Sequence, residues 1–352
     1  MSNAFVGTAS PFYVEHGHFY LESNNIKNGQ INHDHEVFIN DTFYNEQRNK
    51  HLHTNDLVMV QSGHVGDSAV ITKRYNNIAA HALIMFQNPK YSETSRFLNY
   101  YFQSYNAKKK ISVISIGNTI SHILASDMNK FITSFPKSSE QQKIATIFQR
   151  IQDLISLQQR KLKLIKVELS AILQQLLSQK STWPNYKLSQ VVSIQDNKRV
   201  PVKRQDRISG PIPYYGANGV QDYVDGYTHK GDLILIAEDG ANSLTNYPIY
   251  FVNGKIWANN HTHVLRPNKE VNPLFLTVTL KQINYSKYVV GGSRYKLNLE
   301  DLKSIKLNIP NRAQQDKIGG IYNKFYQVQL KKNHKLKLLH KIKHFLLQNM
   351  FI

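Results

Sequence analysis

A long stretch of this sequence occurs twice, and both copies have the residue spacing of an extended helix. The copies cover about residues 139–179 and 313–352. Lys143 and Lys317 are 174 positions apart, and the same interval separates Leu173-Gln174 from Leu347-Gln348 without a gap. Such a register over a long stretch indicates that one half of the chain is related to the other.

The apolar residues of the first copy recur at alternating intervals of three and four. They are Ile144, Phe148, Ile151, Ile155, Leu162, Ile165, Leu169, Ile172 and Leu176, interrupted by Gln158. This period is typical of a coiled-coil seam. The second copy has a weaker seam, with polar residues at 329, 332 and 343. We therefore expect the two helices to pair antiparallel with each other, the alternative being a core helix in each of two ordinary domains.

The segments between the helices also repeat, so the predicted order is domain, helix, domain, helix. Asp232–Ile236 matches Asp56–Val60, Gly240 lies where Gly63 lies, and 305–310 matches 131–136, the expected closing strand of each domain. The expected boundaries are 1–137 and 182–311 for the domains, and 138–181 and 312–352 for the helices. Each domain has short apolar runs and helical segments, such as 95–106, which predicts an α/β (α+β) fold with a mixed, curved sheet. The whole is expected to have a pseudo-twofold internal repeat.

Composition narrows the class of partner. The 352 residues include 44 Lys and Arg against 24 Asp and Glu, a formal charge of +20, which favours a polyanion such as nucleic acid. An anionic membrane surface is the second candidate. No run of eighteen apolar residues exists, so no segment is expected to span a bilayer, and no membrane partner is predicted. The absence of cysteine excludes disulfides and thiolate metal sites, and agrees with a cytoplasmic protein.

Three groups of motifs surround the doubled helix. The first is the loop 61–66 followed by Ala69-Val70-Ile71. The second is formed by 213–219, 237–240 and 259–265, and the third by the Gln-Gln-x-x-Ile helix starts. In this order they resemble the DNA-specificity subunit of type I restriction–modification systems, over nearly the whole chain. The resemblance implies two target recognition domains, each reading half of a split site in double-stranded DNA.

The same resemblance implies partners. The two helices would set the spacing of the half-sites and dock two methyltransferase (modification) subunits, with restriction and translocase subunits joining through the complex. The positions that match the family's helix starts are Gln141, Gln142, Gln314 and Gln315. No cofactor is implied for this chain.

One segment departs from the pattern. The second domain opens with Trp183-Pro184-Asn185-Tyr186-Lys187-Leu188, whereas the first begins near Phe5–Ser10 without such an opening. We therefore expect the N-terminal opening of the first domain to be truncated. A silent or truncated copy of a specificity subunit is an alternative.

Basic, polar and aromatic loop residues are the candidates for contact with DNA, because Arg, Asn, Ser and His read base edges and Lys mostly contacts phosphates. In the first domain they are Gln61, Ser62, His64, Asn118, Thr119 and His122. In the second they are Lys198, Arg199, Arg204, Tyr214, Tyr215, Asn218, Asn260, His261, Ser293, Arg294, Tyr295 and Lys296.

No catalytic motif is found, and the chain is predicted not to be an enzyme. Asn88-Pro89-Lys90 lacks the second proline of an amino-methyltransferase loop, and no phosphate-binding loop occurs. The alternative enzyme reading is a metal-dependent hydrolase using His261, His263 and Asp239; we expect no metal site there, because no cysteine or HExxH motif accompanies these residues. A structural or RNA-binding coiled-coil protein is a third reading.

Overall fold

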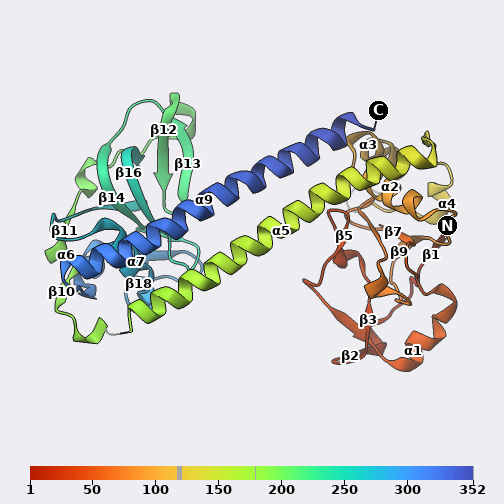
Figure 1. The fold of residues 1–352 in the computed structure, drawn as a ribbon, viewed down its shortest axis with the longest axis horizontal. Coiled ribbons are helices and arrows are strands. Elements are labelled where there is room, and N and C mark those ends of the chain that lie inside the picture. Colours follow the sequence, from red (N-terminus) through yellow and green to blue (C-terminus); the bar gives the residue numbers. More distant parts are fainter. Residues whose placement is uncertain (117–120, 179, 352) are drawn as a thin grey trace. The chain divides into compact units, whose positions relative to one another are not determined.

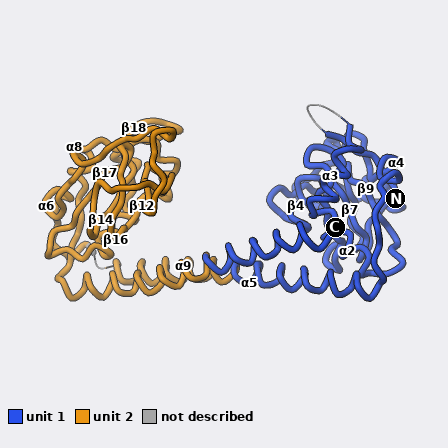
Figure 2. Tube along the Cα trace, turned by 90° about the horizontal axis from the view of Figure 1, so that it is seen from above, with its two compact units in different colours: residues 1–159, 334–352 blue, residues 160–333 orange. Residues whose placement is uncertain are grey.

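The computed structural model describes residues 1–116, 121–178 and 180–351. Asn118 and Thr119, two of the predicted DNA contacts, lie outside the described residues. The chain divides into two compact units: unit 1 comprises 1–159 and 334–352, and unit 2 comprises 160–333 (Figures 1 and 2). Each long helix contributes one part to each unit.

Unit 1 is built on a four-stranded antiparallel sheet with the order β1-β9-β7-β8. The strands are β1 (Ser2–Asn3), β7 (Leu57–Val60), β8 (Ser68–Val70) and β9 (Leu83–Phe86). Leu57 and Met59 face a core shared with helix α2 (Ser92–Phe102) and helix α3 (Tyr105–Ile114), while Val58 and Val60 face the other side. This alternation is that of a strand buried on both faces.

The rest of unit 1 consists of small antiparallel sheets and short helices. Strands β2 (Tyr13–Val14), β6 (Val37–Ile39) and β3 (His18–Tyr20) form one sheet, and β4 (Ile26–Lys27) pairs with β5 (Gln30–Ile31). The short helices are α1 (Asp41–Glu46) and α4 (Ala125–Met128). Tyr20, Ile39 and Phe43 form a separate small core beside these elements.

Unit 2 contains a mixed six-stranded sheet with the order β11-β17-β14-β16-β12-β13. Its strands are β11 (Val192–Ile194), β12 (Ser209–Gly216), β13 (Gly219–Val224), β14 (His229–Ala237), β16 (Ile249–Ala258) and β17 (Thr262–Pro267). Only the β12–β16 pairing, with Tyr214 opposite Trp257, is parallel among the described ladders of this sheet.

The remaining elements of unit 2 cover this sheet and extend it at one end. They are α6 (Leu188–Val191), α7 (Pro273–Lys281), α8 (Leu299–Ser304), β10 (Asn185–Lys187) paired with β20 (Lys306–Asn308), and a three-stranded sheet of β15 (Asp239–Ala241), β19 (Tyr295–Leu297) and β18 (Val289–Val290). The α/β class and the two-domain plan expected from the sequence are confirmed.

The internal repeat is visible in the topology, because the order β1-β9-β7-β8 has the same connectivity as β11-β17-β14-β16. Gly63 and Gly240 follow equivalent strands, and both have a positive φ, 82° and 89°. Ile234 and Ile236 face the helix side of their sheet, as Leu57 and Met59 do. Leu57 is therefore equivalent to Ile234, and the alignment of Asp56 with Asp232 is wrong by one residue.

The long helices are α5 (Ser138–Leu176) and α9 (Arg312–Asn349), and in each unit they run in opposite directions. In unit 1, Phe148 stacks on Phe351 at 5.6 Å between ring centroids, and Lys343 Nζ donates to Gln152 Oε1 at 3.0 Å. Residue numbers thus rise along one helix as they fall along the other. In unit 2, Leu169, Leu173 and Leu177 share a core with Ile318 and Tyr322.

Two local expectations differ from the structure. The helix predicted at 95–106 is two helices, because Ser104 accepts a hydrogen bond from Ala107 N and begins α3. The segment 131–136 is not a strand, although its repeat partner 305–310 contains β20. Among the described residues, no helix is long and apolar enough to cross a membrane.

Candidate nucleic-acid interface

A group of exposed polar side chains gathers in unit 2 where strand β14 ends. We call Asn218, Asp239, His261, Arg294 and Lys296 the strand-end cluster. Asp239 pairs with Lys296 across the β15–β19 ladder, and Asn218 Nδ2 donates to Gly240 O at 2.8 Å. His261 Nδ1 lies 3.7 Å from Asp239 Oδ2, and both side chains are about two-fifths exposed (42% and 43%). The structure thus brings together residues from four separate segments of the chain.

Gly240 allows this close packing. A Cβ at this position would lie 2.9 Å from Arg294 Nη2, and the positive φ of Gly240 is disfavoured for other residues. Arg294 therefore lies against bare backbone. Ser293 and Asn260 are exposed beside the cluster, and Tyr295 is half-buried.

Unit 1 has an equivalent arrangement. Ser62 forms an isolated antiparallel bridge with His122, and Ile123 N donates to Gln61 O at 2.9 Å. In unit 2, Leu297 N donates to Glu238 O at 2.7 Å in the same way. His122 and His64 are exposed, and His64 Nε2 lies 3.1 Å from Ser23 O. Four predicted residues of unit 1 therefore lie at the end of its sheet that is equivalent to the position of the strand-end cluster in unit 2. They are Gln61, Ser62, His64 and His122.

Other predicted residues of unit 2 lie elsewhere or have internal partners. Tyr214 is 1% exposed, its hydroxyl is 3.0 Å from Val202 N, and the Arg207 guanidinium lies 4.1 Å above its ring. Tyr215 is half-buried beside Tyr250, and burial raises the pKa of its hydroxyl to about 12. Lys198 and Arg204 are exposed.

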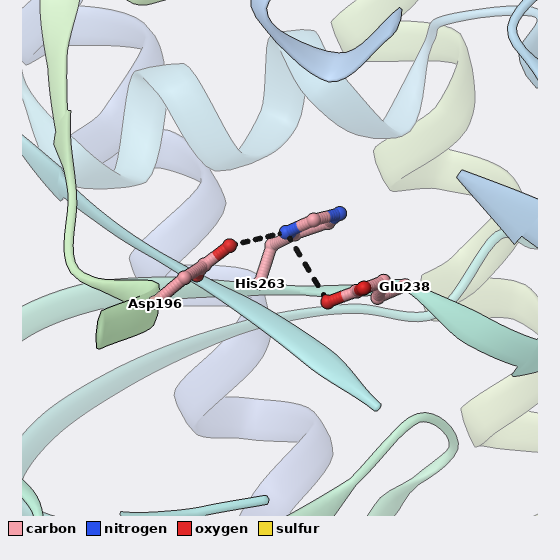
Figure 3. A group of neighbouring side chains, drawn as sticks. All are labelled: Asp196, Glu238 and His263. Atoms are coloured by element: carbon pink, nitrogen blue, oxygen red, sulfur yellow. Dashed lines mark hydrogen bonds and ion pairs between the residues drawn. The ribbon is translucent and has the colours of Figure 1, made fainter. Parts of the chain in front are cut away.

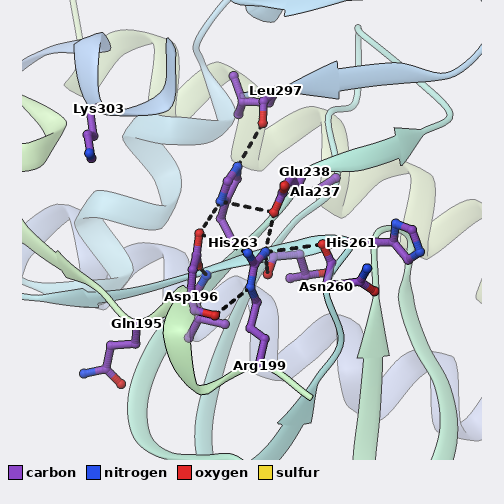
Figure 4. Close-up of polar contacts among 12 residues, drawn as sticks. Gln195, Asp196, Arg199, Ala237, Glu238, Asn260, His261, His263, Leu297 and Lys303 are labelled. Atoms are coloured by element: carbon purple, nitrogen blue, oxygen red, sulfur yellow. Dashed lines mark hydrogen bonds and ion pairs between the residues drawn. The ribbon is translucent and has the colours of Figure 1, made fainter. Parts of the chain in front are cut away.

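Arg199 is held by acidic partners inside the unit. Its guanidinium pairs with Glu238 and lies 3.7 Å from Asp196 Oδ2 (Figure 4). It also donates to Thr262 O at 3.1 Å. The Arg199 side chain is only 16% exposed. The structure thus gives this residue an internal role, which sequence patterns did not indicate because Glu238 is 39 positions away.

His263 completes this network. Its Nδ1 lies 2.6 Å from Asp196 Oδ2 and 3.6 Å from Glu238 Oε2 (Figure 3), and its Nε2 donates to Leu297 O at 2.9 Å. Burial opposes ionisation of Asp196, but hydrogen bonds from His263 and from Val264 N outweigh it and hold the pKa of this carboxyl below its ordinary value. Of the two histidines His261 and His263, His263 is therefore the buried one and His261 the exposed one.

The same network contains the residues that could bind a metal ion. Among the described residues, Asp196, Glu238 and His263 form the one group of donor atoms close enough to share an ion. It differs from the expected set of His261, His263 and Asp239. Arg199 supplies a cation to both carboxylates, and the second nitrogen of His263 is bound to backbone. The residues present therefore fit an internal ion-pair network better than a metal centre.

The glutamines at the helix starts fall into two classes. Gln141 and Gln315 are buried: Gln141 Oε1 accepts from Thr94 Oγ1 at 2.9 Å, and Gln315 Oε1 accepts from Asn272 N at 2.8 Å. Both donate to the carbonyl of a preceding proline, Pro136 or Pro310. These two residues fasten each helix to its own domain. Gln142 and Gln314 are exposed and remain predicted partner contacts.

Comparison with known proteins gives the family. The family model described as the type I restriction modification DNA specificity domain matches residues 12–167 and again 180–341. The chain belongs to this family. A putative type I restriction enzyme specificity subunit of Haemophilus influenzae is 47% identical over 134 residues, and a putative type I specificity subunit of Mycoplasma pneumoniae is 28% identical over 149.

These two matches cover 38% and 41% of this chain, and 35% and 40% of the relatives. The chain thus spans well under half the length of the curated relatives it matches. The crystal structure of a type I restriction–modification S subunit from M. genitalium is similar in fold, with a TM-score of 0.67 and 17% identity. That likeness covers 100% of this chain and 93% of the other. The two matched copies of the domain fall largely in unit 1 and unit 2, respectively.

Proposed function

We propose that the chain is the DNA-specificity subunit of a type I restriction–modification complex, in which each unit reads one half of a split DNA site. The observation that carries the proposal is the double match of a DNA-specificity domain, with an exposed polar site at the same sheet end in both units. A formal charge of +20 supports binding to a polyanion.

The strand-end cluster has the chemistry that base reading needs. Arg294 offers a planar, bidentate donor, Asn218 and Asn260 offer paired donor and acceptor groups, and Lys296 offers a point charge for phosphate. In unit 1, Ser62, His64 and His122 offer hydroxyl and imidazole groups without a fixed charge. The different side chains at equivalent positions imply that the two half-sites differ in sequence.

We assign methylation and cleavage to partner subunits. The exposed Gln142 and Gln314 lie beside the buried glutamines that fix the helix starts, and we place the two methyltransferase subunits there. Restriction subunits would join through that complex. The cytoplasmic location expected from the sequence stays a prediction.

The test is reconstitution. Purified chain, methyltransferase subunits and S-adenosylmethionine are combined with a DNA library, and methylated sites are mapped by sequencing. The proposal expects one split site, methylated only when all components are present. Methylation, cleavage or ATP hydrolysis by the chain alone would contradict the non-catalytic role, and methylation without sequence preference would contradict the specificity role.

The proposal also assigns the spacing of the half-sites to the helices. Seven residues inserted in each helix, after Gln158 and after Lys332, nearly preserve the facing of the seam. Each helix then lengthens by about 10 Å at ~1.5 Å per residue, so the gap between half-sites should grow by at most about three base pairs at ~3.4 Å per base. An unchanged gap with retained methylation would show that helix length does not set the spacing.

A further inference from the structure

A strand that completes unit 2 has no counterpart among the described residues of unit 1. In unit 2, β10 pairs antiparallel with β20 over Asn185–Lys187 and Lys306–Asn308. Two further backbone bonds flank the ladder, from Leu188 N to Ile305 O at 2.8 Å and from Ile309 N to Pro184 O at 2.9 Å. The 174-residue offset makes Phe131–Pro136 equivalent to Ile305–Pro310.

The equivalent backbone in unit 1 is open. Among the described residues, no hydrogen bond to protein is donated by the backbone N–H of Ile132, Thr133, Ser134 or Phe135. Phe135 is 50% exposed, whereas its equivalent Ile309 is 6% exposed. Ile132 is 84% exposed. The carbonyl of Ile132 accepts from Lys110 Nζ at 3.2 Å, but a row of unpaired N–H groups beside apolar side chains is a template for an added strand.

A groove lies along this open edge. Its volume is about 620 Å³, and we call it the unit 1 groove. The residues that line it come from helices α2, α3 and α5, from 133–136 and from the segment after α9. They are Phe97, Tyr101, Asn106, Lys109, Lys110, Val113, 133–136, Glu140, Ile144, Met350 and Phe351. The corresponding cavity of unit 2 is about 260 Å³ and is lined by Trp183, Thr279 and Leu307, among others. The larger space in unit 1 adjoins the edge that lacks a strand.

The internal repeat identifies which side chain fills this space in unit 2. Thr94 and Asn272 both bond the buried glutamine at a helix start, so Phe97 and Phe275, three residues later, are equivalent. The Trp183 ring lies 6.2 Å from the Phe275 ring. In unit 1 the Phe351 and Phe135 rings lie 5.7 Å and 6.1 Å from the Phe97 ring. All three rings line the unit 1 groove, so an indole there would join this aromatic group.

We propose that the unit 1 groove binds an extended polypeptide segment of the Trp-Pro-x-Tyr-Lys-Leu type. The segment adds a strand to residues 131–135 and places an aromatic side chain against Phe97. This site goes beyond the reading of DNA, because it lies on the edge next to the helix start and uses none of the strand-end residues.

The register predicts which backbone groups bind. Every second residue of an antiparallel pair bonds across, and the bonds at Ile305 and Ile309 make Leu307 such a position. Thr133 is equivalent to Leu307, whereas Ser134 is equivalent to Asn308, whose N–H points away from β10 in this pattern. Proline removes an N–H. Thr133→Pro should therefore block strand addition, and Ser134→Pro is the matched control.

The probe is a fluorescein-labelled synthetic peptide with the sequence of residues 181–192, titrated with the full chain and followed by fluorescence anisotropy. We expect saturable binding that weakens at least ten-fold when the peptide's tryptophan is replaced by alanine, or when the chain carries Thr133→Pro. Ser134→Pro should leave affinity within two-fold. Circular dichroism of both variants checks that they are folded.

A second chain keeps the test decisive if a variant fails to fold. Residues 181–193 are copied directly in front of Met1, so that they lead into β1 as they lead into β11 in unit 2. This chain should have a higher melting temperature and should no longer bind the free peptide. Failure of the peptide to bind the original chain, equal binding of a scrambled peptide, or equal effects of the two prolines would overturn the proposal. None of these outcomes bears on DNA reading, which is measured separately by methylation.

Discussion

Asp239 and Lys296 are cross-strand partners in unit 2, and Ser62 and His122 are partners at the equivalent position of unit 1. The flanking backbone bonds, Leu297 to Glu238 and Ile123 to Gln61, are also equivalent. One scaffold therefore presents an aspartate–lysine pair in one unit and a serine–histidine pair in the other. Such a scaffold can change the bases that it reads without changing its fold.

Arg294 should determine one half-site only. In the methylation assay, Arg294→Ala should reduce methylation of the wild-type site about ten-fold or more and relax preference at one or two positions of one half, because a bidentate base contact contributes about 1–3 kcal/mol. Arg312→Ala is the matched control, since Arg312 is also exposed but is paired with Asp316 at the start of α9. An equal loss on every sequence would indicate a phosphate contact instead.

Arg199 should contribute mainly to the stability of unit 2 and less to DNA specificity. Arg199→Ala leaves the partly buried Glu238 and Asp196 carboxylates without their cation, and we expect a loss of about 1–3 kcal/mol in the free energy of unfolding. Arg204→Ala, at an exposed position, should leave stability within about 0.5 kcal/mol. Guanidinium unfolding of the two variants, followed by the fluorescence of Trp183 and Trp257 in unit 2, compares them. A stable Arg199→Ala chain would contradict the internal role.

Gln315 should contribute more to stability than its neighbour Gln314. Gln315→Ala leaves Asn272 N and Pro310 O without partners in a buried place, and each such group costs about 1–3 kcal/mol. Gln314→Ala changes an exposed side chain and should have little effect on unfolding. The reverse order is expected for binding of methyltransferase subunits. Unfolding curves and pull-down assays of the two variants separate the two roles.

Lys343 should make the stability of unit 1 depend on pH. Its ammonium is buried between the helices, donates to Gln152 and Gln103, and burial lowers its pKa to about 8. In the unfolded chain the pKa is about 10.4. Between these values the unfolded state binds more protons, so the free energy of unfolding rises with pH, by up to roughly 3 kcal/mol. Below pH 8 the buried charge is a constant cost.

The measurement compares wild type with Lys343→Met by denaturant unfolding at pH 7, 8, 9 and 10, followed by circular dichroism. Groups that titrate in both proteins cancel in the difference. The wild type should gain stability relative to the variant as pH rises through this range. A difference that is constant with pH would show that Lys343 keeps an ordinary pKa.

The sequence predicted the long helices and the doubled domain because both depend on local, repeated patterns. Partners distant in sequence were not predictable in this way. Lys343 appears in the sequence only as a polar interruption of the second seam, and its burial against Gln152 depends on how the helices pair.

In the candidate site, too, local features could be predicted from the sequence, whereas contacts between residues distant in sequence could not. The exposed loops that carry Arg294 and His122 could be selected by composition and position. Arg199 and Tyr214 belong to equally basic and aromatic stretches, but Glu238 and Val202 occupy their polar groups. The sequence predicts the same closing strand at 131–136 and at 305–310. In unit 2 this strand, β20, pairs with β10, and unit 1 has no such partner among its described residues.

The central claim is that each unit reads one half of the site, and a domain exchange tests it most directly. Residues 1–137 are replaced by a second copy of 182–311, which joins residue 138 as residue 311 joins 312 in the repeat register. The chain is expressed with methyltransferase subunits, and methylated sites are mapped by sequencing. The account predicts a symmetric site, in which the half read by unit 2 occurs twice in inverted orientation. Methylation of the original asymmetric site by the exchanged chain would contradict it.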